Sequence, residues 1–114
     1  LCHMGAAEAK LAYDMGVNKG KTQQLYQLFL DWAIASKSDG IVVGATFPKI
    51  IRYCSQKAGK TLDIFSPGIG VQGGSAKETI SSGTDYLIVG RTILEDKNPV
   101  KIAKDLQLQS LGKK

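Results

Sequence analysis

The residues best suited to chemistry lie in one glycine-rich stretch at residues 66–74, which reads SPGIGVQGG. Glycine has no Cβ, so a ligand can approach the main chain closely there. Backbone N–H groups that precede a helix suit the binding of phosphate. Gly73 and Gly74 stand just before Ser75, where we expect a helix to begin. Gln72 adds an amide that can donate to phosphate or reach a second group of the ligand.

A cation with matching chemistry follows a later apolar run. Residues 86–89 read YLIV, and Gly90 and Arg91 come directly after them. A guanidinium group can bind two phosphate oxygens at once. The glycine-rich stretch follows another apolar run, at residues 62–65. We therefore predict that two consecutive strand ends form one phosphate site. The glycine spacing differs from GxGxxG, which argues against a dinucleotide site.

The elements that must hold these loops alternate along the chain. Helical spacing of apolar residues predicts a helix over residues 22–36. Its stripe consists of Leu25, Leu28, Phe29, Trp32 and Ala35. Short apolar runs without alternation predict strands that are covered on both faces. They lie at residues 41–43, 62–65 and 86–89. We expect a polar loop at residues 15–21 and the tail of one more strand at residues 1–5.

Start and stop signals bracket two further helices. Pro48 fits a first helical turn, where a missing N–H costs nothing, and Gly59 ends that helix. Ser75 and Glu78 match the capping box S-x-x-E, so a helix begins at Ser75 and stops near Gly83. Each helix is the next element after a predicted strand, which is the arrangement of βα units.

The last predicted helix completes the order α, β, α, β, α, β, α. It begins at Asn98 with Pro99 in its first turn, and it is expected to bury Val100, Ala103 and Leu106. Strands that recur every ~20–25 residues predict a parallel sheet with helices outside. The sheet is either open and doubly wound or half of a (β/α)8 barrel, which needs about 250 residues when complete. In barrels, phosphate commonly binds the loops after the last two strands.

Composition narrows the class of protein. The chain has 114 residues, 43% of them hydrophobic, which suits one domain over residues 1–114. Its charge of +5 comes with scattered lysines, so we expect a solvated face and no nucleic acid partner. We expect no membrane partner, since no apolar run approaches about 20 residues. Cys2 and Cys54 lack metal-ligand spacing and indicate free thiols in a cytoplasmic setting, and a single histidine, His3, excludes a multi-histidine site.

These motifs together resemble the C-terminal half of the orotidine 5′-monophosphate decarboxylase family, in its compact microbial and archaeal type. The family's strand seven ends in SPGxGxQGG, as at residues 66–74, and its strand eight ends in IVGRxI, as at residues 88–93. Asn98 and Pro99 match an NP pair, and residues 43–46 match the turn after strand six. The resemblance implies a (β/α)8 barrel of which this chain holds about strands five to eight with their helices.

The resemblance also implies which residues bind substrate. The family often shows MSHxGA after strand five, where this chain reads LCHMGA, so Cys2 holds the place of a serine that contacts the pyrimidine edge. A thiol is a weaker donor than a hydroxyl. We expect His3 to be structural. The implied substrate-binding residues are Cys2, Pro67, Gly68, Gly70, Gln72, Gly73, Gly74, Gly90 and Arg91.

The activity that the resemblance implies is decarboxylation of orotidine monophosphate to uridine monophosphate and CO2, without metal or organic cofactor. The family's catalytic Asp/Lys array follows a D-x-K-x-x-D motif, which this sequence does not contain. We therefore expect no catalytic residue here and an array in a missing N-terminal half, because the chain begins without Met and in mid-pattern. The expected partners are orotidine or uridine monophosphate, that N-terminal half and a second copy in a homodimer.

Two other functions remain open from the residues. One is a different phosphate-binding barrel enzyme, such as a sugar-phosphate decarboxylase or an isomerase. The position of Gln72 favours a nucleotide, because its amide can reach back to a pyrimidine carbonyl. The other is a non-catalytic half-barrel module, which would expose apolar surface and would then dimerise or aggregate.

Overall fold

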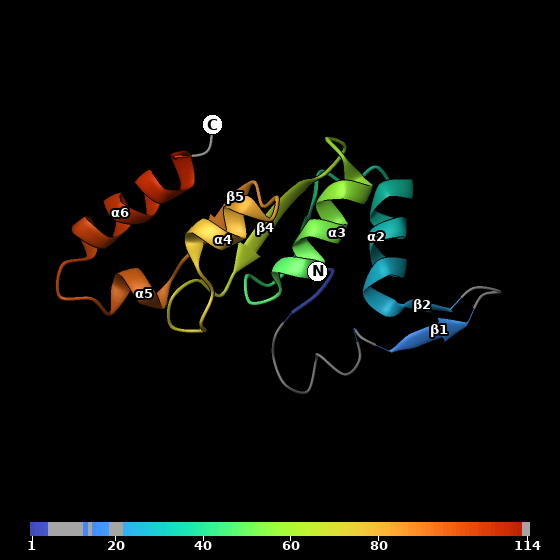
Figure 1. Ribbon diagram of the computed structural model, residues 1–114, viewed down its shortest axis with the longest axis horizontal. Helices are drawn as coiled ribbons and strands as arrows, with labels where there is room; N and C mark the ends of the chain where they lie inside the picture. The colour runs from blue at the N-terminus through green and yellow to red at the C-terminus, as the bar shows by residue number, and fades with distance from the viewer. Residues whose placement is uncertain (5–12, 14, 19–21, 113–114) are drawn as a thin grey trace.

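The computed structural model describes residues 1–4, 13, 15–18 and 22–112. Three parallel strands form its central sheet in the order β3-β4-β5 (Figure 1). They are β3 (Gly40–Val42), β4 (Asp63–Pro67) and β5 (Tyr86–Ile88). The predicted α/β architecture with a parallel sheet is therefore confirmed, and each strand begins within two residues of its expected place.

The chain start adds a fourth parallel segment at the β3 edge. His3 pairs with Val43 in an isolated parallel bridge, and the Gly44 N–H donates to the His3 carbonyl oxygen over 3.0 Å. The Cys2 N–H donates to the Val42 carbonyl oxygen over 2.9 Å. The expected strand tail is thus present at residues 2 and 3, and residue 5 lies outside the described residues.

A helix follows each strand of the sheet. α3 (Pro48–Ala58) follows β3, α4 (Ala76–Ser81) follows β4, and α5 (Arg91–Leu94) follows β5 directly. The last helix is α6 (Pro99–Leu111). Parallel strands need such crossovers, and the crossovers place the helices on the face of the sheet.

The predicted caps are confirmed. The Ser75 hydroxyl accepts from the Glu78 N–H over 3.3 Å, and the Asn98 side chain accepts from the Lys101 N–H over 3.2 Å. Gly59 ends α3 at a φ of +59°. Each of these bonds satisfies a backbone donor that a helix start would otherwise leave without a partner.

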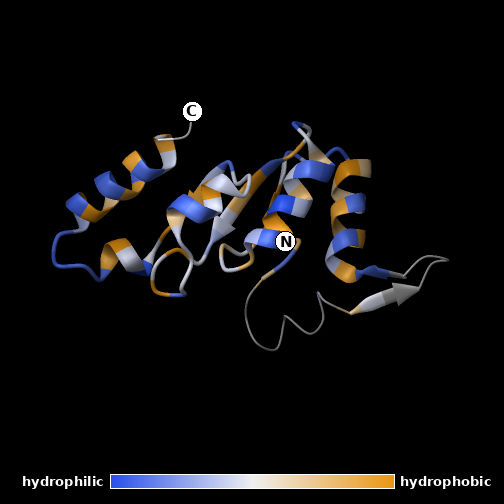
Figure 2. Ribbon diagram, in the orientation of Figure 1, coloured by the Kyte–Doolittle hydropathy of each residue, from blue (hydrophilic) through white to orange (hydrophobic). Residues whose placement is uncertain are grey.

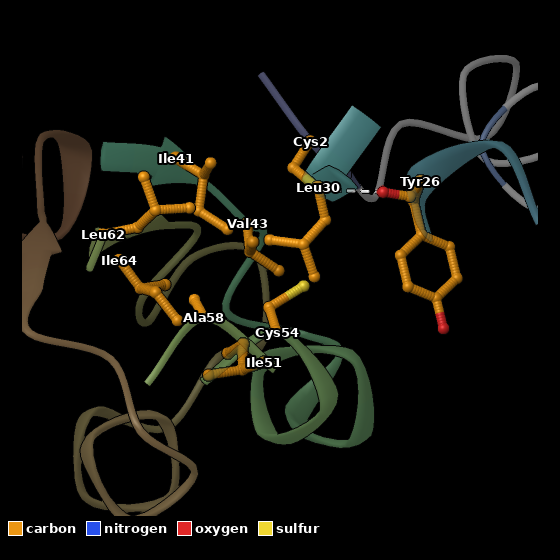
Figure 3. Packing of buried hydrophobic residues seen from close by; sticks show 10 residues of the cluster. All are labelled: Cys2, Tyr26, Leu30, Ile41, Val43, Ile51, Cys54, Ala58, Leu62 and Ile64. Atoms are coloured by element: carbon orange, nitrogen blue, oxygen red, sulfur yellow. Dashed lines mark hydrogen bonds between the residues drawn. The ribbon is translucent and has the colours of Figure 1, made fainter. Parts of the chain in front are cut away.

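The main core lies between β3, β4 and the helices α2 (Leu25–Ala35) and α3, as Figure 3 shows. Its buried members are Cys2, Tyr26, Leu30, Ile41, Val43, Ile51, Cys54, Ala58, Leu62 and Ile64. A second cluster joins Ala45, Ile69 and Ala76, so it lies beneath the glycine-rich stretch. The fold therefore anchors that stretch through Ile69, which is 6% exposed.

The opposite face of the sheet is open. Phe65 and Tyr86 are partners in the β4–β5 register, and their rings stack 4.9 Å apart at 17°. Tyr86 is 53% exposed, and Ile88, two residues along the same strand, is 47% exposed. Side chains alternate across a strand, so these residues share one face while Ile64 and Ser66 are buried on the other.

Two predictions near the N-terminus are wrong. Residues 22–24 do not begin a helix: they form β2 (Thr22–Gln24), which pairs antiparallel with β1 (Gly16–Asn18). Residues 16–18 therefore belong to a strand and not to the expected polar loop, of which residues 19–21 lie outside the described residues. The helix begins later because Gln24 and Gln27 form a capping box, in which the Gln24 N–H donates to Gln27 Oε1 over 3.0 Å.

Two predicted apolar faces are confirmed only in part: Phe29 of α2 packs against the main core and Leu106 of α6 packs against the second cluster, but other members do not. In α2, Tyr26 and Leu30 are buried, whereas Trp32 from the expected stripe is 54% exposed. Nearly every α2 residue is apolar, so periodicity could not select the buried face. In α6, Val100 is 63% exposed, and the expected Ala103 and Leu106 are only half-buried. Figure 2 shows hydrophilic and hydrophobic stretches interleaved along α6.

Candidate functional site

The two predicted strand-end loops line one hollow. β4 and β5 are parallel neighbours, so their carboxyl ends lie at the same edge of the sheet. A hollow of about 240 Å³ opens there. Its lining residues are Pro67, Gly68, Ile69, Val71, Gln72, Ile88, Gly90, Arg91 and Thr92. Gln72 and Arg91, the two side chains expected to bind phosphate, therefore border the same space.

The loop after β4 folds into a compact turn through its own main chain. The Gly70 N–H donates to the Gly74 carbonyl oxygen over 2.9 Å. The Gly73 N–H donates to the Gly70 carbonyl oxygen over 2.7 Å, and the Gly74 N–H donates to the Gly68 carbonyl oxygen over 3.0 Å. The expectation that the amides of Gly73 and Gly74 serve as anion donors is not met in this structure, because both amides already have acceptors inside the loop.

Glycine is needed in this turn for two different reasons. Gly73 has a φ of +92°, which L side chains rarely adopt, although the space around it is open. Gly70 has a φ of +78°, and a Cβ there would collide with the Thr92 side chain. Gly70, Gly73 and Gly74 thus shape the loop, and none of the three lines the hollow.

Gln72 and Gly68 are in close contact at the rim of the hollow. An ideal Cβ on Gly68 would lie 2.8 Å from Gln72 Oε1, so the side-chain amide of Gln72 folds over the Gly68 main chain. Gln72 itself is exposed, which leaves its Nε2 group available to donate to a ligand.

Arg91 supplies positive charge at this rim. It is the first residue of α5, directly after Gly90, and it is exposed. Among the described residues, no hydrogen bond or ion pair engages its guanidinium group. A free guanidinium beside a donor amide can receive a phosphate group in a bidentate manner.

Cys2 lies away from the hollow. Its side chain is 1% exposed and its Sγ donates to the Tyr26 carbonyl oxygen over 3.2 Å, within the main core. A hydrogen bond from Cys54 lowers the pKa of the Cys2 thiol against the effect of burial. The same contact and burial raise the pKa of Cys54, whose sulfur points toward Leu30 in Figure 3. The structure therefore does not bring the Cys2 side chain to Gln72 and Arg91.

His3 is buried among aromatic rings. Its ring centroid lies 4.8 Å from that of Phe47, 5.4 Å from that of Tyr13 and 5.5 Å from that of Tyr26. Its side chain is 0% exposed. These contacts fit the expected structural role of His3.

A larger hollow of about 470 Å³ lies at the other end of the sheet. It is lined by Ile34, Lys37, Ser38, Asp39, Lys60, Thr61, Leu62 and Asp63, which surround the amino ends of β3 and β4. Ligands of parallel α/β sheets bind at the carboxyl ends of strands, so we assign the site to the smaller hollow. In the part of the chain that the structure describes, no three metal-binding side chains gather, and no helix is long and apolar enough to span a bilayer.

Sequence reasoning missed four residues of the hollow. Ile69 anchors the loop, Val71 is 57% exposed, and Ile88 lies on the open face of the sheet. Thr92 contacts the main chain of Ile69 and Val71 from α5. All four lie within the two strand-end motifs, at residues 66–74 and 88–93, and that position is the signal that could have found them.

Comparison with known proteins gives consistent relatives. A family model described as "Orotidine 5'-phosphate decarboxylase / HUMPS family" matches residues 1–106. Orotidine 5'-phosphate decarboxylase of Pyrococcus furiosus is 38% identical over 78 residues, which covers 68% of this chain and 37% of that protein.

Solved structures agree with this match. The Pyrococcus horikoshii enzyme superposes with a TM-score of 0.68 at 35% identity, over 75% of this chain and 41% of that one. The Methanocaldococcus jannaschii enzyme, in complex with inhibitor BMP, gives 0.69 at 27% identity, over 76% and 41%.

The matched part spans about two fifths of each of these relatives. The predicted barrel fold is confirmed: the parallel sheet and its helices form part of a (β/α)8 barrel, and an open doubly wound sheet is excluded. The chain belongs to the orotidine 5'-phosphate decarboxylase / HUMPS family.

Proposed function

We propose that this chain is the phosphate- and pyrimidine-binding part of an orotidine 5′-monophosphate decarboxylase, and that residues 1–114 form the C-terminal half of one barrel domain. One observation carries the proposal: Gln72 and Arg91 border a single hollow at the carboxyl ends of neighbouring parallel strands. Phosphate sites of (β/α)8 barrels commonly lie at this place. Membership of the family supports a nucleotide as the ligand.

The phosphate group is held by side-chain donors more than by the glycine loop. The Arg91 guanidinium supplies the charge and two parallel N–H donors, and the Gln72 amide supplies a neutral donor from the facing loop. Gly90 leaves space beside Arg91, since a Cβ there would meet nothing within 4 Å. The loop glycines Gly70, Gly73 and Gly74 act by keeping Gln72 at the rim.

Catalysis is assigned to the part of the protein that completes the barrel. Carboxylate side chains there would crowd the departing carboxylate group, and a lysine side chain would protonate the pyrimidine carbon that it leaves. The open face with Phe65, Tyr86 and Ile88 supports this division, because inward-facing residues of a complete barrel are packed by side chains from other strands. Residues 1–114 alone would then bind ligand without turning it over.

Binding of the remote phosphate contributes to the rate of the reaction in this scheme. Contacts far from the reacting carbon hold the nucleotide so that its pyrimidine meets the catalytic residues in one orientation. The neighbour in complex with inhibitor BMP supports a pyrimidine nucleotide ligand. By analogy with the family, we also assign the protein to the cytoplasm and to homodimers, and we assign it no metal or organic cofactor.

A binding experiment on the natural full-length polypeptide tests the proposal. Calorimetry should show binding of uridine monophosphate and much weaker binding of uridine and of ribose 5-phosphate. Arg91→Ala should weaken the monophosphate about 10- to 100-fold, because a hydrogen bond to a charged group contributes about 1.5–3 kcal/mol. Lys60→Ala, which removes a cation from the larger hollow at the other end of the sheet, is the matched control and should leave affinity unchanged.

Two results would contradict this function. Equal loss of affinity in the Lys60 and Arg91 variants would show that charge alone, and not the site, attracts the nucleotide. Preference for ribose 5-phosphate over uridine monophosphate would favour a sugar-phosphate enzyme of the same family.

A further inference from the structure

A single hydroxyl joins the two loops of the site. Thr92 Oγ1 donates to the Ile69 carbonyl oxygen over 2.7 Å and accepts from the Val71 N–H over 3.2 Å. Thr92 belongs to α5, whereas Ile69 and Val71 belong to the loop after β4. One side chain therefore uses both its donor and an acceptor position to hold the main chain of another segment.

The contact between Thr92 and the loop is also sterically close. An ideal Cβ on Gly70 would collide with Thr92 Oγ1 and would lie 2.7 Å from Thr92 Cγ2. The loop main chain thus rests directly on the threonine side chain, and only glycine at residue 70 allows this approach.

The sequence neighbours of these residues are the two proposed phosphate ligands. Gln72 follows Val71, and Arg91 precedes Thr92. Thr92 is thus adjacent in the chain to Arg91, and its hydrogen-bond partner Val71 is adjacent to Gln72. All four residues line the same hollow. The two hydrogen bonds of Thr92 determine how the loop with Gln72 sits relative to the helix with Arg91.

We propose that Thr92 is a positioning residue for the phosphate group: it holds the loop after β4 against α5 so that Gln72 and Arg91 can contact one anion. This inference rests on the proposed function of the hollow. Thr92 itself need not touch the ligand, because it acts through the position of Gln72.

Two substitutions separate the hydroxyl from the shape of the side chain. Thr92→Val keeps the volume and removes both hydrogen bonds, whereas Thr92→Ser keeps the hydroxyl. Thr61→Val is the control, because Thr61 Oγ1 donates to the Ala58 carbonyl oxygen over 2.6 Å at the other end of the sheet. All variants are made in the natural full-length polypeptide.

Two measurements then test the inference. Hydrogen exchange of the Val71 amide reports on the loop without any ligand, and it should become faster in Thr92→Val but not in Thr92→Ser. Titration with uridine monophosphate should show about tenfold weaker binding in Thr92→Val, because the loop no longer holds Gln72 beside Arg91. The affinity of Thr92→Val for uridine should change by less than about twofold. The affinity of Thr61→Val for uridine monophosphate should likewise change by less than about twofold.

A double-mutant cycle identifies the route of the effect. If Thr92 acts through Gln72, Thr92→Val should have no further effect on affinity in a Gln72→Ala background, since the positioned group is already gone. An undiminished tenfold effect in that background would overturn the inference.

Other outcomes are equally decisive. Unchanged exchange at Val71 would show that Thr92 does not hold the loop. Faster exchange with unchanged monophosphate affinity would show that the loop position does not matter for the ligand. If the wild-type protein bound no nucleotide, the proposed function and the positioning role would both fail, and the exchange data would still show whether Thr92 holds the loop.

Discussion

Ser66 Oγ and Thr84 Oγ1 lie 2.7 Å apart in the buried layer between the sheet and its helices. Ser66 is 0% exposed and Thr84 is 5% exposed. Ser66 belongs to β4, just before the glycine-rich loop, and Thr84 precedes β5, whose far end carries Arg91. The hydroxyl pair therefore joins β4, which leads into the loop with Gln72, to the residue that leads into β5.

We expect the double substitution of this pair to lower the free energy of unfolding by less than the sum of the two single substitutions. Ser66→Ala or Thr84→Val leaves one buried hydroxyl without its partner, at a cost of about 1–3 kcal/mol. Removing both hydroxyls leaves no orphan, so the double variant should lose less than the sum of the two. Urea unfolding of the four proteins measures the coupling. Strict additivity would show that the two hydroxyls do not share a bond in solution.

A side chain added at Gly73 or at Gly74 should lower the free energy of unfolding, for a different reason at each position. Gly73→Ala meets open space but must adopt a φ of +92°, which costs about 1–2 kcal/mol. Gly74→Ala would place a Cβ against the Gly68 carbonyl oxygen and 2.8 Å from the Ala45 Cβ, so the main chain itself must shift. We expect Gly74→Ala to lower the unfolding free energy more.

Asparagine distinguishes the two causes. Asn tolerates positive φ better than Ala, so Gly73→Asn should recover part of the stability that Gly73→Ala loses. Gly74→Asn should recover none, because the obstacle there is space. Equal behaviour of the two positions in thermal or urea unfolding would contradict this assignment.

The candidate site could be predicted because its signals are local. Glycines with positive φ, the Ser75 cap and the Gly90–Arg91 pair all mark main-chain conformations that few other residues allow. Regular βα units then place consecutive strand ends at one edge of the sheet, which brings Gln72 and Arg91 to one hollow without any knowledge of side-chain packing.

The missed features depend on contacts between distant residues. Periodicity cannot choose the buried face of α2, since nearly all its residues are apolar, and β1 becomes a strand only by pairing with β2. The internal hydrogen bonds of the loop left no pattern in the sequence, so the amides of Gly73 and Gly74 looked available for an anion. The burial of Cys2 likewise depends on Tyr26 and Cys54, which are far away in the chain.

Asp31 and Lys57 join α2 to α3 on the surface, and their contribution should depend on pH. Lys57 Nζ lies 2.7 Å from Asp31 Oδ1, and Gln23 Nε2 donates to Asp31 Oδ2 over 2.7 Å. The bond to Lys57 lowers the pKa of Asp31, and the bond to Asp31 raises the pKa of Lys57. The pair therefore stabilises the fold fully between the ordinary pKa values of the two groups, about 4 and about 10.4.

The two pKa shifts determine how this contribution to stability changes with pH. The contribution is lost as pH falls through the lowered pKa of Asp31, and it is lost again as pH rises through the raised pKa of Lys57. Both side chains are more than a third exposed, so Asp31→Asn should cost only about 0.2–0.5 kcal/mol at pH 7. Urea unfolding at low salt and at about 1 M salt, where the Debye length falls to about 3 Å, measures this cost. A cost that does not shrink with salt would point to lost hydrogen bonding with Gln23 and not to the ion pair.

Cys2→Ser should affect stability and leave nucleotide affinity unchanged. The Cys2 thiol donates to the Tyr26 carbonyl oxygen inside the core and does not line the hollow, so a hydroxyl in its place has no ligand to meet. It keeps an acceptor at Tyr26, and we expect a loss of about 1 kcal/mol or less. Cys54→Ser is the matched comparison: it places a hydroxyl in the same core, where Cys2 remains its hydrogen-bond partner, and should cost about 1 kcal/mol. Calorimetric titration with uridine monophosphate decides the functional part. Severalfold stronger binding in Cys2→Ser, with unchanged binding in Cys54→Ser, would contradict this prediction. It would show that the side chain of residue 2 reaches the pyrimidine in the ligand-bound protein.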